Sequence, residues 1–310
     1  MSGTFVSIGN GTQSFARLLD EIKAVADRLP QPVIVQHGRT PFESQAIEHF
    51  AFTDEDGFKR RLRDCDLFIT HGGGGSVFAA IREAKRPVVV PRRKAFDEIV
   101  DDHQLAFTAE LARQGNIEPV FDVGDLLAAV SRALANPLPA SDDGQGAQAV
   151  AIIERCVHEL SSDDSPILLV TPSGGHLSEM RSLAAVYEHR PHHFVINTPV
   201  VQTREMKGRT SIISLSQRDL KFFVNMWEAF QIMRREKPGV MLTTGGGFSV
   251  AFALIAKVFR IPVVYVETVA KVDVPTVTGR FMYYLADRFF YQWRQLERFF
   301  PKGRFIGLVL

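Results

Sequence analysis

Short apolar runs alternate with segments of helical periodicity along the whole chain. A run FVSI is followed by apolar residues at helical spacing, at positions 15, 18, 19, 22 and 25, and then by the run VIVQ. The runs DLFIT, PVVV, PILLV, FVIN, VMLTT and PVVYV repeat this pattern. Strands separated by helices form parallel sheets, and continuous apolar runs are typical of strands buried on both faces. The sequence therefore predicts the α/β class.

Polar segments divide the chain into two halves. Residues 136–148 are rich in Pro, Ser, Asp and Gly, and the stretch SSDDSP follows a helical segment that ends at Leu160. We place the boundary near residue 163, which gives domains of 1–163 and 164–310. Each half has a glycine turn after its first strand and a glycine run after a later strand. This shared plan predicts two Rossmann-like domains that face each other across a central cleft.

Composition narrows the class of protein. The chain of 310 residues is 45% hydrophobic, with a formal net charge of +1, which argues against a nucleic-acid-binding protein that works by bulk electrostatics. Two cysteines cannot form a disulfide framework, and the first residues lack the features of a signal peptide, so we expect a reducing cytosol. The longest apolar run, 248–259, is interrupted by Lys257 and is too short to span a bilayer. We expect any membrane contact to be peripheral.

Four glycine-rich loops follow strands and open helices, at residues 9–14, 71–76, 173–176 and 245–249. A helix N-terminus offers unpaired N–H groups, and glycines let a phosphate approach them closely, although tight turns alone also favour glycine. Four such loops fit a diphosphate donor and a diphosphate acceptor. The strand VIVQHG lacks the acidic ribose ligand of nicotinamide enzymes, and no HExxH motif or close Cys/His set occurs. We therefore expect neither a cofactor nor a metal.

The motifs resemble two known families. FVSIGNGTQSF, ITHGGGGSV, VVVPRR and DDHQ resemble the donor-binding C-terminal domain of family 28 glycosyltransferases, in particular the small catalytic subunit of the eukaryotic UDP-GlcNAc transferase of dolichol-linked oligosaccharide synthesis. SGGHLSEM, KPGVMLTTGGGFSV, VVYVETVAKV and LADRFFYQW resemble the membrane-recruiting partner subunit. Paired subunits of bacterial exopolysaccharide and capsule clusters, including glucuronosyl and galactosyl transferases, are also similar, and the PRR to DDHQ stretch is closer to those.

The resemblance implies a GT-B fold with the donor domain first, the reverse of the order in the lipid II enzyme. Helix 146–160 would then cross back to the acceptor domain, or the linker would let domains of different chains pair in a homodimer. The implied substrates are a UDP-sugar and a polyprenyl-diphosphate-linked sugar. The implied location is the inner, cytosolic face of the plasma membrane.

Donor contacts are predicted from both glycine loops of the first half and from residues 92–104. Helix N-termini at residues 9–13 and 73–76 would stabilise the departing diphosphate without a metal. Arg92 and Arg93 would reinforce them or bind a donor carboxylate, unless they are a solvated pair. The ribose-binding Glu of the lipid II enzyme is absent after Ser76, so Ser76, the Gly75 N–H or the Asp102 and Gln104 pair are candidates for that role. The predicted donor-binding residues are Gly9, Asn10, Gly11, Thr12, Gln13, Phe52, His71, Gly73, Gly74, Gly75, Ser76, Arg92, Arg93, Asp102, His103 and Gln104.

Three residues of the second half are candidates for the base that an inverting transfer requires. His176 lies at a helix N-terminus, where the dipole keeps an imidazole neutral, and Glu179 lies one turn on. Glu267 ends the strand PVVYV and looks like a glutamate of the lipid II enzyme. Alternatively, His176 binds only acceptor phosphate and Glu267 only caps backbone. The predicted acceptor-binding residues are Ser173, Gly174, Gly175, Gly245, Gly246, Gly247 and Arg280.

An aromatic and basic segment, KFFVNMWEAFQIMRREK, predicts a membrane-facing helix, although an aromatic helix face is also typical of a core. The predicted membrane residues are Phe222, Phe223, Met226, Trp227, Phe230, Arg234 and Arg235.

Together these features predict an inverting glycosyltransferase that forms a β-linkage in exopolysaccharide or capsule synthesis. Glucuronate is the favoured donor sugar, with GlcNAc and galactose open. A UDP-sugar 2-epimerase and a non-catalytic sugar-nucleotide-binding scaffold are the alternatives.

Overall fold

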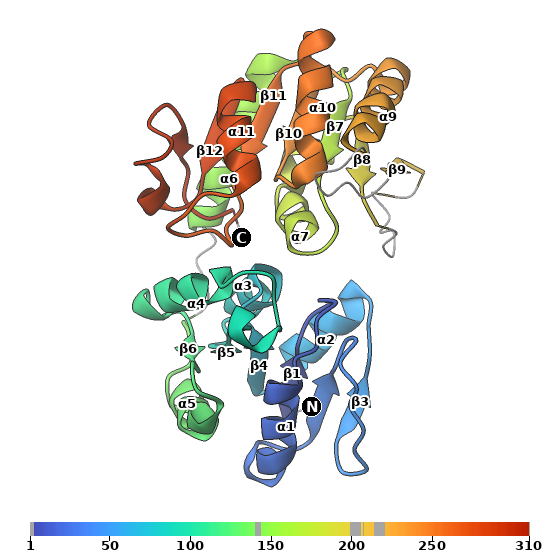
Figure 1. Ribbon diagram of the computed structural model, residues 1–310. Coiled ribbons are helices and arrows are strands. Elements are labelled where there is room, and N and C mark those ends of the chain that lie inside the picture. Colours follow the sequence, from blue (N-terminus) through green and yellow to red (C-terminus); the bar gives the residue numbers. More distant parts are fainter. Residues whose placement is uncertain (1–2, 140–143, 199–205, 207, 214–220, 310) are drawn as a thin grey trace. The chain divides into compact units, whose positions relative to one another are not determined.

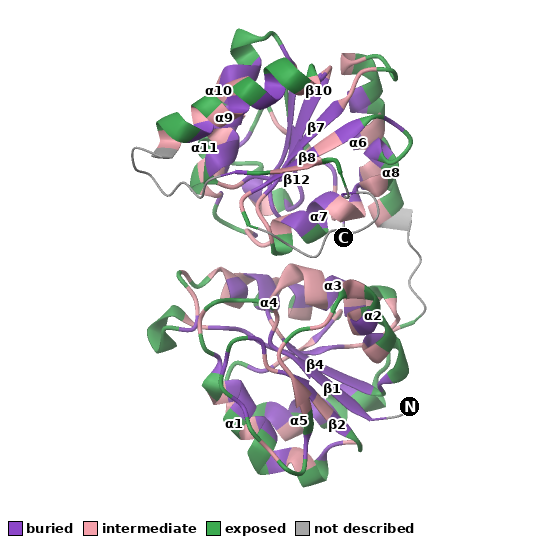
Figure 2. Cartoon of the chain, turned by 90° about the vertical axis from the view of Figure 1, so that its right-hand side faces the viewer, coloured by how far each residue is buried: buried purple, intermediate pink, exposed green. Residues whose placement is uncertain are grey.

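The computed structural model describes residues 3–139, 144–198, 206, 208–213 and 221–309. The chain divides into two compact domains, Met1–Asp142 and Asp143–Leu310. In each domain a parallel sheet lies between layers of helices (Figures 1 and 2).

The first sheet has the strand order β3-β2-β1-β4-β5-β6, with every neighbouring pair parallel. Its strands are β1 (Thr4–Ser7), β2 (Val33–Gln36), β3 (Glu48–Phe50), β4 (Leu67–His71), β5 (Val88–Val90) and β6 (Glu118–Pro119). Its helices are α1 (Ala16–Val25), α2 (Glu55–Asp64), α3 (Gly74–Arg82), α4 (His103–Arg113) and α5 (Leu126–Ala135). Short 3-10 turns occur at Ala26–Arg28, Lys94–Phe96 and Val123–Asp125.

Strands of the first sheet are buried on both faces, as their continuous apolar runs predict. Val6 and Ile69 pack with Leu18 in one core cluster, whereas Phe5 and Phe68 pack on the other face. The pairs Phe5 with Phe68 and Val6 with Ile69 lie opposite each other in the β1–β4 register, so alternate side chains point to opposite cores.

The second sheet has the order β13-β12-β11-β10-β7-β8-β9 and is also parallel. Its strands are β7 (Ile167–Val170), β8 (His192–Ile196), β9 (Thr210–Ile212), β10 (Val240–Thr243), β11 (Val263–Val266), β12 (Arg288–Tyr291) and β13 (Arg304–Phe305). Helices α6 (Gly144–Leu160), α7 (Gly175–Ser182) and α8 (Ala184–Tyr187) contribute to one layer. Helices α9 (Lys221–Glu236), α10 (Gly247–Val258) and α11 (Val277–Leu285) form the other layer (Figure 2), and a 3-10 turn covers Arg294–Leu296.

Helix α6 belongs to the second domain, so the division lies earlier in the chain than residue 163. Its buried residues Ile153 and Val157 pack in one cluster with Leu169 of β7 and Leu242 of β10. The polar stretch after Leu160 is therefore a connection within a domain, and the Pro- and Gly-rich stretch before α6 separates the domains. Helix α6 covers the second sheet, as the crossover implied by the resemblance requires.

Strand order reverses at the first strand of each domain. β1 lies between β2 and β4, and β7 lies between β8 and β10. In open α/β sheets ligands bind outside the carboxyl ends of the strands at such a switch point. The four predicted glycine loops follow β1, β4, β7 and β10, so each switch point has a pair of them. The α/β, GT-B fold class with two Rossmann-like domains is thus confirmed.

Candidate functional site

His71 ends β4 at the switch point of the first domain, and both glycine loops close on its ring. A β-carbon on Gly9 or on Gly73 would overlap the imidazole, and Gly9 has a φ of +72°. Burial, reinforced by the nearby charges of Arg92 and His103, lowers the pKa of His71 to about 3. The ring is therefore neutral at physiological pH and fixes the spacing of the two loops.

Arg92 lies beneath the first loop and is only 3% exposed. Burial lowers the pKa of this guanidinium to about 10, so it keeps its charge at neutral pH. The guanidinium donates to four carbonyl oxygens, those of Ile8 (3.1 Å), Gln13 (2.9 Å), Ser14 (3.2 Å) and Glu98 (3.1 Å). One cation thus holds both ends of loop 9–14. We therefore correct the assignment of Arg92 as a direct donor ligand, because its donors point into the protein's own backbone.

Three other side chains of segment 92–104 also form hydrogen bonds with main-chain groups. Asp102 Oδ1 accepts from the N–H of Lys94 at 2.8 Å, and Gln104 Oε1 accepts from the N–H of Arg92 at 2.9 Å. The Arg93 guanidinium donates to the carbonyl of Phe121. Of the pair predicted for the ribose, Gln104 is buried and occupied by the backbone, whereas Asp102 is exposed and stays a predicted donor contact.

His103, by contrast, is half-buried at the start of α4. Its ring makes a short contact with the carboxylate of Asp101. Its charge lies close enough to His71 to influence that ring. His103 stays a predicted donor contact.

Three further placements bear on donor binding. Helix α3 begins at Gly74, as predicted, but α1 begins only at Ala16, so the amides of residues 9–13 do not form a helix N-terminus. Phe52 is 52% exposed and is not a core side chain. The residues that stay exposed or half-buried around His71 are Asn10, Gly11, Thr12, Gln13, Gly73, Gly74, Gly75 and Ser76.

Gly9→Ala should weaken UDP binding by about tenfold or more, because the new methyl group would overlap the His71 ring. In addition, a left-handed backbone conformation costs a residue with a β-carbon roughly 1–2 kcal/mol. Gly115→Ala is the matched control, since Gly115 has a φ of +76° but no atom within 4 Å of its β-carbon position. Equal losses of UDP affinity in both variants, measured by calorimetry, would show that strain alone acts.

His176 is the second residue of α7 and joins the two loops at the switch point of the second domain. Its Nδ1 lies 2.8 Å from the carbonyl oxygen of Thr244. A carbonyl can only accept, so Nδ1 carries a proton, and in the neutral form of the imidazole Nε2 is then the acceptor nitrogen. Thr244 Oγ1 donates back to the His176 carbonyl at 3.1 Å and lies 2.9 Å from Thr171 Oγ1. The geometry fits a histidine that takes a proton through Nε2.

Glu267 is buried beneath the same edge of the sheet. Its carboxylate accepts from the Tyr265 hydroxyl and the Thr276 N–H, both at 2.9 Å, and a β-carbon on Gly279 would overlap it. Burial raises the pKa of Glu267, and the bonds from Thr276 and Tyr265 oppose that shift. Because it has no exposed surface, we correct its assignment as a base: Glu267 holds the start of α11.

Glu179 is buried too and is likewise reassigned from catalysis to holding a loop. It accepts from the Thr268 hydroxyl at 2.6 Å and the Val269 N–H at 3.1 Å, while its Oε2 has no hydrogen-bond partner among the described residues. With Glu267 it anchors both ends of residues 268–276. Sequence reasoning missed Tyr265, Thr276 and Gly279, although Thr276 followed by Gly279 at the start of α11 is a readable N-cap signal.

Burial raises the pKa of Glu179 to about 8 from 4.5, so between these values the folded protein holds a proton that the unfolded chain releases. Stability contributed by this site is therefore lost as pH rises through that window. Glu179→Gln should gain thermal stability relative to the wild type as pH rises from 5 to about 8, whereas the exposed Glu188→Gln should not. A difference in Tm that is constant with pH would contradict this assignment.

The remaining acceptor candidates lie near His176. Gly174 and Gly246 have φ of +92° and +91° and precede α7 and α10, and Gly175, Gly245 and Gly247 complete the two loops. The Ser173 hydroxyl donates to the carbonyl of Thr198 at 3.0 Å. Arg280 is exposed in the first turn of α11, directly after Gly279.

Helix α9 exposes part of its aromatic face. Phe223 is 68% and Trp227 62% exposed, and Phe222, Met226 and Phe230 are half-buried. Arg234 and Arg235 are exposed at its end, whereas Ile232 and Met233 are buried. No helix in the described part of the chain is long and apolar enough to cross a membrane. The described residues also contain no group of three His, Cys, Asp or Glu side chains placed to hold a metal ion.

A different family model matches each half of the chain. The Glycosyltransferase family 28 C-terminal domain matches residues 5–155, and Oligosaccharide biosynthesis protein Alg14 like matches residues 200–309. These ranges fall mainly in the first and second domains respectively.

Individual relatives show the same division. The chain is 27% identical over 211 residues to UDP-N-acetylglucosamine transferase subunit ALG14 of Homo sapiens, covering 53% of this chain and 95% of that protein. It is 27% identical over 128 residues to subunit ALG13 of Mus musculus, covering 38% of this chain and 10% of that protein. The solved glycosyltransferase SnogD of Streptomyces nogalater matches with 11% identity and a TM-score of 0.23 over 95% of this chain and 87% of that one, too low to carry an argument. The first half of the chain is therefore similar to a family 28 glycosyltransferase C-terminal domain, and the second half is similar to Alg14-like proteins.

Proposed function

We propose that the chain is an inverting glycosyltransferase that moves a sugar from a UDP-sugar to a polyprenyl-diphosphate-linked saccharide and forms a β-linkage. The observation that supports this most is the matched pair of switch points, each with two glycine loops joined by a histidine. The names of the relatives, which are two subunits of a UDP-N-acetylglucosamine transferase, support a UDP-sugar donor and a division of the work between two domains. Transfer further requires the two switch-point edges to meet, within one chain or in a homodimer.

In this mechanism the first domain holds the donor. Amides of the loop after β4 and the start of α3 would bind the UDP diphosphate and stabilise the negative charge that develops as it leaves. His71 and Arg92 act from below by fixing the positions of the loops. We expect no metal to be required, because helix-terminal amides can supply this stabilisation.

The second domain would supply the attacking group. The acceptor hydroxyl attacks the anomeric carbon, the bond from that carbon to UDP breaks, and the hydroxyl proton passes to Nε2 of His176. Attack opposite the leaving group inverts the anomeric centre. The loops before α7 and α10, with Arg280, would bind the diphosphate of the lipid carrier.

N-acetylglucosamine is the donor sugar that we favour, because it stands in the names of the relatives. The expectation of glucuronate depended on the resemblance to exopolysaccharide pairs and on Arg92 and Arg93. Arg92 is buried on four carbonyls and Arg93 donates to Phe121, so neither guanidinium is poised for a carboxylate. Glucuronate and galactose, the donor sugars expected for an exopolysaccharide or capsule pathway, are therefore compared with N-acetylglucosamine in the test below.

The test incubates the purified chain with each of UDP-GlcNAc, UDP-glucuronate and UDP-galactose and a synthetic polyprenyl diphosphate that carries one sugar. We expect a lipid-linked disaccharide and UDP with one donor, with and without EDTA. Interconversion of the free UDP-sugar without acceptor would instead indicate an epimerase. UDP binding without any transfer would indicate a scaffold.

The lipid-linked acceptor needs a membrane-facing surface, and the layer of α9, α10 and α11 offers one. Besides Phe223 and Trp227 of α9, it exposes Phe281 and Tyr284 of α11, at 59% and 84%. Phe230 and Phe259 join α9 to the end of α10 with ring centroids 5.4 Å apart. The exposed arginines Arg234, Arg260 and Arg280 suit anionic lipid headgroups. We propose that this surface binds the cytosolic face of the membrane peripherally.

Trp227→Ser should lower binding to anionic vesicles by roughly tenfold, since burial of a large apolar side chain is worth about 1.5–3 kcal/mol. The control is Phe121→Ser, which removes an aromatic side chain exposed on the first domain. Co-sedimentation measures both variants, and equal binding by Trp227→Ser and the wild type would contradict the proposed surface.

A further inference from the structure

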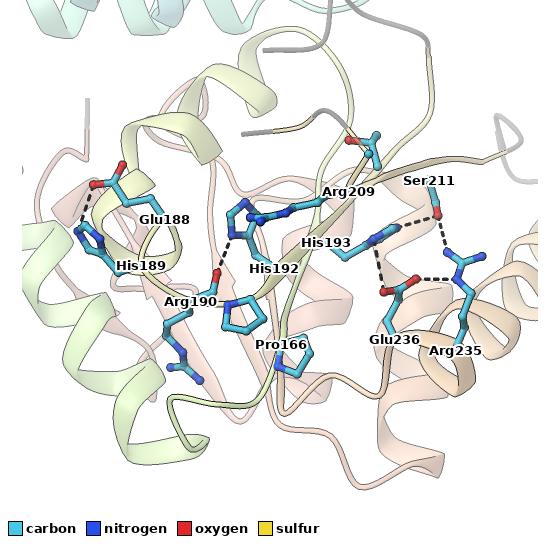
Figure 3. A pocket seen from close by; sticks show the side chains of 13 residues that line it. Pro166, Glu188, His189, Arg190, His192, His193, Arg209, Ser211, Arg235 and Glu236 are labelled. Atoms are coloured by element: carbon cyan, nitrogen blue, oxygen red, sulfur yellow. Dashed lines mark hydrogen bonds and ion pairs between the residues drawn. The ribbon is translucent and has the colours of Figure 1, made fainter. Parts of the chain in front are cut away.

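A polar pocket of about 730 Å³ lies in the second domain, at the edge of the sheet opposite to the loops around His176 (Figure 3). Pro166 and Pro191 precede β7 and β8, and Gly208 precedes β9, so the pocket opens at the amino-terminal ends of these strands. The loops around His176 follow the carboxyl ends. Strands of this length rise about 3.3 Å per residue, which places roughly 15 Å of sheet between the two sites. The pocket is thus separate from the candidate acceptor site.

Four side chains form a closed ring at one end of the pocket (Figure 3). His193 Nε2 lies 2.8 Å and Arg235 Nη2 lies 3.0 Å from the hydroxyl of Ser211. Arg235 Nε lies 2.6 Å from one carboxylate oxygen of Glu236, and His193 Nδ1 lies 3.6 Å from the other. Burial lowers the pKa of His193, so the ring holds one positive and one negative charge at neutral pH. The side chains at this end of the pocket are therefore connected to one another and balanced in charge.

Two further arginines leave the pocket with an excess of positive charge. Arg209 is exposed and its side chain has no partner among the described residues. Arg190 is buried, and its Nη2 donates to the Ser161 hydroxyl at 2.9 Å and to the carbonyl oxygens of Ser162 and Ser165. Asp163, 3.8 Å from its Nη1, is 72% exposed and well screened. The Nε and Nη1 atoms of Arg190 have no hydrogen-bond partner in the described structure. The other acidic residue, Glu188, lies at the opposite end beside His189 (Figure 3).

We propose that this pocket binds a phosphate-bearing ligand, with the phosphate or diphosphate group on the guanidinium of Arg209. A guanidinium offers the paired donors that phosphate oxygens accept, whereas the hydroxyl proton of Ser211 is used within the ring. The lining is polar and charged, which disfavours an apolar ligand, and three metal-binding side chains do not come together in the described residues. The carboxyl ends of α8 and α9 oppose an anion, but the dipole effect is smaller than that of a charge-assisted hydrogen bond.

The test is NMR of the histidine imidazoles in the whole chain, with sodium pyrophosphate as the probe and sodium chloride at equal ionic strength as the reference. The signals of His192 and His193 should shift and saturate, because both rings line the pocket. Arg209→Ala should weaken this binding by at least roughly tenfold, while Arg155→Ala, at an exposed arginine of α6 outside the pocket, should leave it unchanged. The signal of His71 reports on the first domain, so failure of the proposed donor site would be seen separately.

A second titration uses vesicles of phosphatidylcholine with or without phosphatidylglycerol. Shifts with the anionic vesicles alone identify a lipid headgroup as the source of the phosphate, and shifts with pyrophosphate identify a free ligand. An adventitious response, equal in the wild type and in Arg209→Ala, would overturn the proposal. So would unmoved His192 and His193 signals in both titrations.

Discussion

His176→Ala should lower kcat for glycosyl transfer by about 10²–10⁴-fold and leave UDP affinity nearly unchanged, the usual cost of removing a general base. The reason is the tautomer that Thr244 imposes, which places the proton on Nδ1 and leaves Nε2 to accept one from the acceptor hydroxyl. Single-turnover transfer to the lipid-linked acceptor measures the loss.

His176→Asn separates catalysis from the joining of the two loops. The asparagine amide can still donate to the Thr244 carbonyl, but it has no nitrogen able to take a proton. If His176 is the base, this variant should be as slow as His176→Ala, and the acid limb of the pH–rate profile should disappear. Recovery of most activity in His176→Asn would leave His176 with a positioning role only. His189→Ala, at an exposed histidine of the same domain, is the control.

Arg92→Lys should raise the Kd for UDP by about tenfold to a hundredfold, since hydrogen bonds from charged groups are worth roughly 1.5–3 kcal/mol each. The guanidinium spans the carbonyls of Ile8 and Ser14 at the two ends of the loop, and a lysine ammonium cannot reach both. Calorimetry at a temperature where the variant is folded measures the effect.

Arg93→Lys is the control for this prediction, because its guanidinium contacts only one loop carbonyl, that of Phe121, and it should bind UDP nearly as the wild type does. A fall in Tm of Arg92→Lys with unchanged UDP affinity would mean that Arg92 stabilises the domain without shaping the donor loop. Loss of UDP affinity and of Tm together in Arg93→Lys would contradict the distinction between the two arginines.

The arrangement of strands and loops could be predicted from the sequence because each depends on local pattern. Apolar runs such as VMLTT mark strands buried on both faces, and the glycines that follow mark the turns at their carboxyl ends. The starts of α3, α7 and α10 accordingly fall at glycine positions. Parallel topology then brings those ends together at the switch points without further information.

The direction in which a charged side chain points at those ends could not be predicted. Arg92 and Glu267 both follow an apolar strand at the edge where ligands bind, yet both turn into the protein and hold loops. Their partners are main-chain groups distant in sequence, such as the carbonyl of Ile8, and no motif marks them. His176 differs because its partner, Thr244, lies in the neighbouring glycine loop, so the contact joins the two loops of the switch point.

The position of helix α6 determines where the chain can be cut into two halves. A fragment that begins after residue 163 would lack the helix that covers Leu169 and Leu242, and would present that apolar surface to water and aggregate. Fragments that end near residue 139 and begin near residue 144 would each retain a whole core. Such halves, mixed in solution, would reveal how strongly the two domains associate without a covalent link.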